Sequence, residues 1–231
     1  MNSLKARQVL PNLYQIKHSD PGSVKAGMAT NTYILTANDK ALIIDAAFDY
    51  LLQPIKEVLG TTLTVAGFFY SHNHVVGNSN FLNGYKAEFN VPFFLHPIDA
   101  AVFGSANSHF FENPINHASL ADFNMEVKLF AGHTKGSVII YQAENDGLII
   151  AGDAAMGATD GQALEGMERL IRVPAQMSSS DEEIKNNWIN WNLPVAHFAP
   201  YHGVAYYNKK EEMPHIMRLL TRQEVTRNLN G

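Results

Sequence analysis

The same hairpin pattern occurs twice in this sequence, and the repeat limits the folds open to the chain more than any other feature. Residues 33–47 and residues 137–155 each contain two β-branched runs around a turn with Asn and Asp. Each copy also places an Asp just past a Leu-Ile-Ile run, and these are Asp45 and Asp153. Hairpins can resemble one another without any deeper relation. We favour the alternative, a duplicated unit with two layers.

Strands and helices alternate through the rest of the chain. Apolar residues recur at helical spacing up to Gly60, and short β-branched or aromatic runs predict strands between the helices. We expect strands at residues 63–70, 91–95, 125–130 and 195–199, and helices at 50–59, 98–103, 181–191 and 211–227. Two hairpin-rich halves with helices between them predict an α+β fold of four layers, in which one sheet packs on the other and helices cover the outside.

Length and charge narrow the class of protein. The chain has 231 residues, which suits one large domain, so we expect a single domain over residues 1–231. Its composition, 46% hydrophobic and 17% charged, is that of a globular chain. The formal net charge of −5 argues against nucleic acid or an anionic membrane surface as a partner. No apolar run approaches the ~18 residues of a membrane helix and no signal peptide is visible, so we expect a cytoplasmic protein.

Histidines and one aspartate gather at expected strand ends. The chain has no cysteine and ten histidines, so any transition metal must be held by histidine and carboxylate side chains. His72 and His74 directly follow a hydrophobic strand, and His133 lies in a Gly-flanked turn. Asp153 and His202 each end a strand beside a glycine. Each element alone is well explained by a surface loop, a tight turn or a helix cap. All four together, in this order, predict one metal site.

The order of these elements resembles that of the metallo-β-lactamase-fold superfamily. The resemblance covers most of the chain and includes Ser-His-x-His, Gly-His-Thr-x-Gly-Ser, a Gly-Asp strand end and a final His-Gly. It implies an αββα sandwich built from two similar halves, which agrees with the hairpin repeat. By position, it implies that His72, His74 and His133 hold one metal. It also implies that Asp153 bridges two metals and that His202 helps to hold the second.

The sequence departs from the family at the second metal site. The family motif is His-x-His-x-Asp-His, but an alignment without a gap puts Val76 and Gly77 at its last two positions. The alternative is a three-residue deletion, because residues 75–78 resemble the stretch that normally follows the motif. Both alignments lose the same two ligands, so we expect at most one well-occupied metal site. Three histidines leave one tetrahedral position open, where zinc can lower the pKa of a bound water to about 7.

Three functions are consistent with such a site. The first is a zinc hydrolase, with one ion in preference to two, in which metal-bound hydroxide attacks an ester, amide, thioester or phosphoester and Asp153 or His202 transfers the proton. The second is a non-haem iron oxidoreductase similar to sulfur dioxygenases, with His72, His133 and Asp153 as a two-histidine, one-carboxylate face. The third is a catalytically impaired member that acts as a binding module. We expect the first, with a small-molecule substrate.

Other residues could contribute to the site. Asp45 could orient a ligand histidine from behind. Residues 105–120 show little periodicity and could form a loop over the site, in which His109 or His117 replaces the missing ligand. Residues 157–180 are irregular and correspond to a region that often lines the substrate pocket in the family.

Two arginines and one aromatic cluster have open interpretations. Arg169 or Arg172 could bind an anionic substrate, although a solvated side chain is the simpler interpretation of each. The run His109-Phe110-Phe111 could be a lid or an oligomer contact, and the second of these would suit a homodimer.

Overall fold

The structure, a computed structural model, describes residues 4–19, 27–46, 48–77 and 80–222. Its larger sheet has seven strands, which lie side by side in the order of the sequence. They are β1 (Ala6–Leu10), β2 (Leu13–His18), β3 (Thr30–Ala37), β4 (Lys40–Ile44), β5 (Thr64–Phe69), β6 (Phe93–Phe94) and β7 (Phe111–Glu112). Neighbours from β1 to β4 are antiparallel, and neighbours from β4 to β7 are parallel.

The second sheet repeats the central arrangement of the first. Its four strands lie in the order β13, β10, β9, β8, with bounds β8 (Glu126–Leu129), β9 (Val138–Gln142), β10 (Leu148–Gly152) and β13 (His197–Pro200). In each sheet a hairpin, β3–β4 or β9–β10, is followed by a strand parallel to its second arm. A separate ribbon pairs β11 (Met156–Gly157) with β12 (Leu170–Ile171). The duplicated unit predicted from the hairpins is therefore present.

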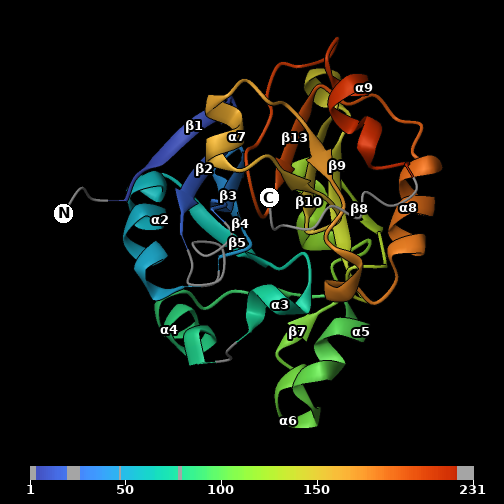
Figure 1. Ribbon diagram of the computed structural model, residues 1–231. Helices are drawn as coiled ribbons and strands as arrows, with labels where there is room; N and C mark the ends of the chain where they lie inside the picture. The colour runs from blue at the N-terminus through green and yellow to red at the C-terminus, as the bar shows by residue number, and fades with distance from the viewer. Residues whose placement is uncertain (1–3, 20–26, 47, 78–79, 223–231) are drawn as a thin grey trace.

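Helices cover the outer face of each sheet. Figure 1 shows α2 and α4 on one outer side of the molecule, α8 and α9 on the opposite side, and the two sheets between them. The α-helices are α2 (Leu52–Leu59), α3 (Asn73–Val76), α4 (Asn80–Glu88), α5 (Pro97–Ala100), α6 (Ser105–Ser108), α7 (Asp160–Leu164), α8 (Asp181–Ile189) and α9 (Met213–Ile216). The 3-10 helices are η1 (Asp49–Leu51), η2 (Ala101–Phe103), η3 (Ala118–Phe123), η4 (Glu144–Asp146), η5 (Ala175–Met177) and η6 (Met217–Leu219). The four-layer αββα prediction is confirmed.

The alternation of side chains along the hairpins explains the four layers. Successive residues of a strand point to opposite faces, so Ile34 packs under α2 and α4 while Leu35 packs between the sheets. In the second sheet Ile140 faces the first sheet, and Ile139 packs against Trp188 of α8. Each fully buried side chain of this size contributes roughly 1.5–3 kcal/mol of burial free energy. Apolar residues on both faces of each hairpin thus require a cover on both sides.

Most predicted elements are found within two residues of their expected ends, but the last helix is shorter than expected. Only α9 and η6 form within residues 211–222, and residues 223–227 lie outside the described chain. Pro214 explains the late start, because proline lacks an N–H and fits only the first turn of a helix. The expected loop at 105–120 is also partly wrong, since it contains α6 and the edge strand β7. Among the described residues, no helix combines the length and apolarity needed to cross a membrane.

Candidate metal centre

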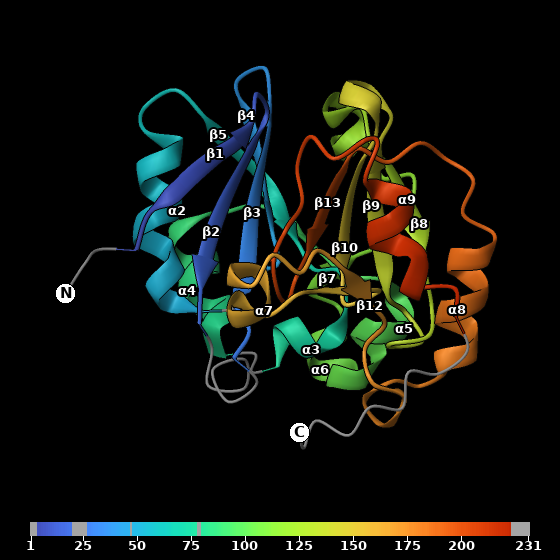
Figure 2. The same ribbon diagram turned by 45° about the horizontal axis from the view of Figure 1, so that its top comes forward.

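The candidate site lies where strands of both sheets end at one edge. Asp45 follows β4 and His72 follows β5, its parallel neighbour. In the second sheet β8, β10 and β13 point the same way, and they lead to His133, Asp153 and His202. Loops at the carboxyl ends of parallel strands commonly bind ligands. Figure 2 shows α3, the short helix after β5, between the ends of the two sheets.

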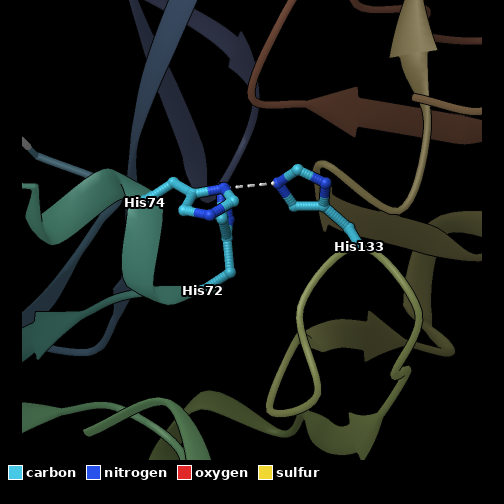
Figure 3. A group of neighbouring side chains, drawn as sticks. All are labelled: His72, His74 and His133. Atoms are coloured by element: carbon cyan, nitrogen blue, oxygen red, sulfur yellow. Dashed lines mark hydrogen bonds between the residues drawn. The ribbon is translucent and has the colours of Figure 1, made fainter. Parts of the chain in front are cut away.

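Three histidine side chains converge at this edge. One ring nitrogen from each of His72, His74 and His133 lies within 4.8 Å of the other two. His74 Nδ1 and His133 Nε2 are 2.9 Å apart, and Figure 3 shows these two rings facing one another from α3 and from the loop after β8. Within the described part of the chain, no other group of three histidine or acidic side chains is as close. The arrangement suits a single metal ion bound by three imidazoles.

The ring nitrogens of His72 are used in different ways. Nδ1 lies 3.0 Å from Ser71 Oγ, whereas Nε2 is buried and has no hydrogen-bond partner among the described residues. Burial lowers the pKa of His72 well below its usual value and also lowers that of His133. Both rings are therefore neutral, which is the form that binds metals. A buried nitrogen without a hydrogen-bond partner, on a residue grouped with two other histidines, is what an ion at this position would satisfy.

Asp153 is buried beside the histidines and is bonded to His202. Both of its carboxylate oxygens accept from His202 Nδ1, at 2.9 and 3.1 Å. Its Oδ2 lies 3.6 Å from His72 Nε2 and 3.7 Å from His133 Nε2, too far for hydrogen bonds. Burial tends to raise the pKa of Asp153, but His202, together with His72 and His133, outweighs it and holds that pKa below its usual range. The five residues singled out in the sequence thus lie in one cluster.

Comparison with known proteins identifies the fold. No family model and no curated protein matches the chain. Among solved structures, DIM-1 metallo-β-lactamase matches at 12% identity over 94% of this chain and 97% of its own, with a TM-score of 0.69. A metallo-β-lactamase from Erythrobacter litoralis matches at 13% over 95% and 92% (TM-score 0.65), and one from Pontibacter korlensis at 15% over 95% and 100% (TM-score 0.63). The protein has the metallo-β-lactamase fold.

In this metallo-β-lactamase fold, a core residue, Val76, takes the position where an alignment without a gap puts the Asp of the motif. Val75 and Val76 belong to the hydrophobic cluster beneath α2 and α4, and neither lines the cavity at the histidines. Gly77 follows them with a φ of +42°. A position that aligned with a metal ligand should face the site, so this placement favours the three-residue deletion over the alignment without a gap.

Neither candidate replacement ligand reaches the site. His109 Nδ1 lies 3.4 Å from Ser105 O at the end of α6. His117 precedes η3, accepts from Ser119 N and pairs with Glu112 through Nε2. Neither belongs to the three-histidine group of the described chain. The idea that one of them substitutes for the missing ligand is therefore wrong for this structure.

Asp45 supports His72 indirectly, through hydrogen bonds with Ser71. Its Oδ1 accepts from Ser71 N at 2.7 Å and its Oδ2 from Ser71 Oγ at 2.9 Å, and Ser71 Oγ contacts His72 Nδ1. Burial raises the pKa of Asp45 to about 7, although the bonds from Ser71 act the other way. The two halves thus use the same residue types at equivalent strand ends, Asp45 with His72 and Asp153 with His202. In the first half a serine stands between them.

Asn31, which the sequence patterns did not single out as a functional residue, holds the turn that carries His202. Its Nδ2 donates to Pro200 O at 3.0 Å and to Gly203 O at 2.8 Å, and its Oδ1 accepts from Gln15 Nε2 at 2.7 Å. Its partners on this turn are about 170 residues away in the chain. No local pattern could therefore reveal them.

Gly152 is required by the close approach of the two halves, and Gly152→Ala is expected to loosen the site. Its φ is +53°, and a Cβ there would lie 2.3 Å from Ser71 Oγ and 2.5 Å from Ser71 Cβ. The methyl group must therefore displace Ser71 or strain the turn before Asp153. We expect the affinity of the site for a metal ion to fall about 10-fold or more, as when other residues that support a metal ligand are changed. Chelator competition measures this, and Gly166→Ala is the control, because its φ is also positive but its surroundings are open.

A cavity of about 740 Å³ opens onto His74, His133 and His202. Ile98, Val102 and Met177 form exposed apolar parts of its lining, and Lys135 lines it too. The irregular segment 157–180 therefore contributes through Met177 and its neighbours, as the resemblance implies. Arg172 does not line the cavity, because it forms a two-pronged pair with Asp181 and bonds to backbone carbonyls near the end of the described chain. Arg169 does not line it either.

Proposed function

We propose that this protein is a metal-dependent hydrolase that uses one ion, held by His72, His74 and His133. The observation that carries the proposal is the buried His72 Nε2, which has no hydrogen-bond partner in the described chain, on a residue that shares one close group with His74 and His133. Zinc suits three neutral nitrogen ligands, and one coordination position would stay open for water or substrate. The fold of the chain supports the same assignment, because the solved structures it resembles are named metallo-β-lactamases.

Asp153 and His202 are the groups that would handle protons. When bound, the metal supplies polarisation of the scissile bond and acidification of the attacking water. Asp153 Oδ2 is close to two of the three histidines and would be the residue that accepts a proton beside the bound ion. His202 Nδ1 donates to both Asp153 oxygens, so it carries a proton and fixes the carboxylate in place. His202 would thus position Asp153 directly, where the family uses a second ion.

A second candidate, an iron oxidoreductase, is favoured by one distance pattern. Asp153 Oδ2 is almost equidistant from His72 Nε2 and His133 Nε2, at 3.6 and 3.7 Å. Two histidines and one carboxylate are a common ligand set for non-haem iron. The 2.9 Å approach of His74 to His133 favours the three-histidine set instead. Elemental analysis of protein purified without added metal distinguishes the two, with zinc expected.

Hydrolysis is tested with a panel of acyl and phosphoryl substrates. We expect zinc-loaded protein to hydrolyse at least one among a nitrophenyl ester, a thioester, a chromogenic β-lactam and a phosphodiester. Activity should vanish after chelation and return with zinc. Asp153→Asn should lower kcat by about 100-fold or more, because general-base assistance contributes roughly 10²–10⁴-fold. Fully zinc-loaded protein that turned over none of the four classes would contradict the hydrolase proposal and favour a binding role.

The remaining expectations stay predictions. They are a single domain over residues 1–231, a small-molecule substrate, a cytoplasmic location, the possibility of a homodimer, and the lack of nucleic-acid and membrane partners.

A further inference from the structure

Asp99 is a buried carboxylate that the sequence analysis did not connect with the site. It lies on α5, just after β6, and β6 is the parallel neighbour of β5. Its side chain is almost fully enclosed, with 1% of the residue exposed. It therefore sits at the same carboxyl edge of the sheet as His72, one strand further along.

Three hydrogen bonds converge on this carboxylate. Oδ2 accepts from Asn73 N at 2.8 Å and from Thr134 Oγ1 at 2.6 Å, and Oδ1 accepts from Gly136 N at 2.8 Å. Two of the three donors are the backbone N–H groups of Asn73 and Gly136, and backbone N–H groups are costly to leave unpaired when buried. The three bonds together account for both oxygens of the side chain.

The donors are direct neighbours of the metal-binding histidines. Asn73 stands between His72 and His74, and Thr134 follows His133. The first donor is the first residue of α3, in the segment that follows β5 of the first sheet, and the second lies in the loop after β8 of the second sheet. Asp99 thus ties together the two loops whose separation sets the distances among the three histidines.

Gly136 shows how close this contact is. A Cβ at residue 136 would lie 2.7 Å from both Asp99 N and Asp99 Oδ1, closer than real Cβ contacts come. Glycine at this position therefore lets the His133 loop press against the Asp99 carboxylate. The glycine that follows Gly-His-Thr-x in this sequence has a specific physical role here, which is to admit the carboxylate.

We propose that Asp99 is a positioning residue that presets the metal centre by bonding both histidine loops. The inference rests on the proposed function only in assuming that a metal binds the three histidines. A carboxylate suits this place because all three partners donate, and an amide of the same size would turn an NH2 group toward one or more of them. Fixing ligand loops before the ion arrives raises its affinity, and residues behind a ligand commonly contribute 10–100-fold.

The test compares Asp99→Asn with the wild-type chain in the absence of any substrate. The zinc Kd is measured by chelator competition, and the visible spectrum of the cobalt-substituted protein reports the ligand geometry. We expect zinc binding to weaken about 10–100-fold, with a changed cobalt spectrum. Thr134→Val should act in the same direction more weakly, and Thr134→Ser, which keeps the hydroxyl, should restore wild-type behaviour. The threonine pair also decides the matter if Asp99→Asn does not fold.

The control is Gln142→Leu. Gln142 is as buried as the site residues and donates to Phe123 O at 2.6 Å, but it lies at the opposite end of β9 from the His133 loop. It should lower the Tm without changing the zinc Kd. Wild-type zinc affinity and cobalt spectrum in both Asp99→Asn and Thr134→Val would overturn the inference, even if the enzyme proved active. Tight zinc binding that depends on Asp99, in a protein that hydrolyses nothing, would overturn the hydrolase proposal alone.

Discussion

Replacing His133 by alanine is expected to abolish tight metal binding. His133 Nε2 is 2.9 Å from His74 Nδ1 and 3.7 Å from Asp153 Oδ2, so it is the member of the cluster that links His74 on α3, and His72 just before it, to the second half of the molecule. Without it, two histidines from one loop remain. The loss of metal affinity should exceed the roughly 10–100-fold that is typical when a residue hydrogen-bonded to a metal ligand is replaced. Zinc titration should show one tight equivalent per wild-type chain and none in the variant.

The matched control for His133→Ala is another buried histidine. His197 begins β13, at the opposite end of that strand from His202, and its Nδ1 accepts from Asn208 N at 3.0 Å. His197→Ala should keep the tight zinc equivalent while lowering the free energy of unfolding. A His133→Ala chain that still bound one zinc ion tightly would show that the three histidines do not form the site. Two tight equivalents in the wild-type chain would contradict the loss of the second site.

The parts of the fold that could be predicted are those that depend on a local sequence pattern. The alternation of Ile34 with Leu35 and of Ile139 with Ile140 indicates strands that are covered on both faces, and the structure places a sheet on one side and helices on the other. The start and the length of the last helix were harder to predict. Pro214 delays its start, and its length depends on packing against the second sheet, which the helical pattern alone does not describe.

The residues of the site also fall into two groups, those that a local sequence pattern indicates and those that it does not. His72 and His133 were found because they follow strands and have recognisable neighbours. Asp99 lies in an unremarkable Pro-Ile-Asp segment, and its role depends on β6 running parallel to β5, which only the assembled sheet reveals. Asn31 was missed because its carbonyl partners come from the far end of the chain. Residues that hold ligands in place are selected by distant partners, so local patterns report them poorly.

Placing the Asp of the His-x-His-x-Asp-His motif at position 76 is expected to destabilise the protein and not to create a second metal site. Val76 is fully buried in the cluster beneath α2 and α4, together with Leu82 and Tyr85. A carboxylate there would lose its hydration with no cation beside it, which costs several kcal/mol. Val76→Ala, which removes two methyl groups, should cost only about 2 kcal/mol. Urea unfolding of the two variants measures the difference.

The same reasoning extends to metal content. His74 and Val76 are two residues apart on α3, and side chains at that spacing on a helix do not face each other. With His74 directed toward His133, residue 76 points into the core, so the double variant Val76→Asp, Gly77→His should still bind at most one zinc ion. A second tight equivalent in that variant would mean that α3 can unwind to present both new ligands. It would also favour the alignment without a gap, whereas the burial of Val76 favours the three-residue deletion.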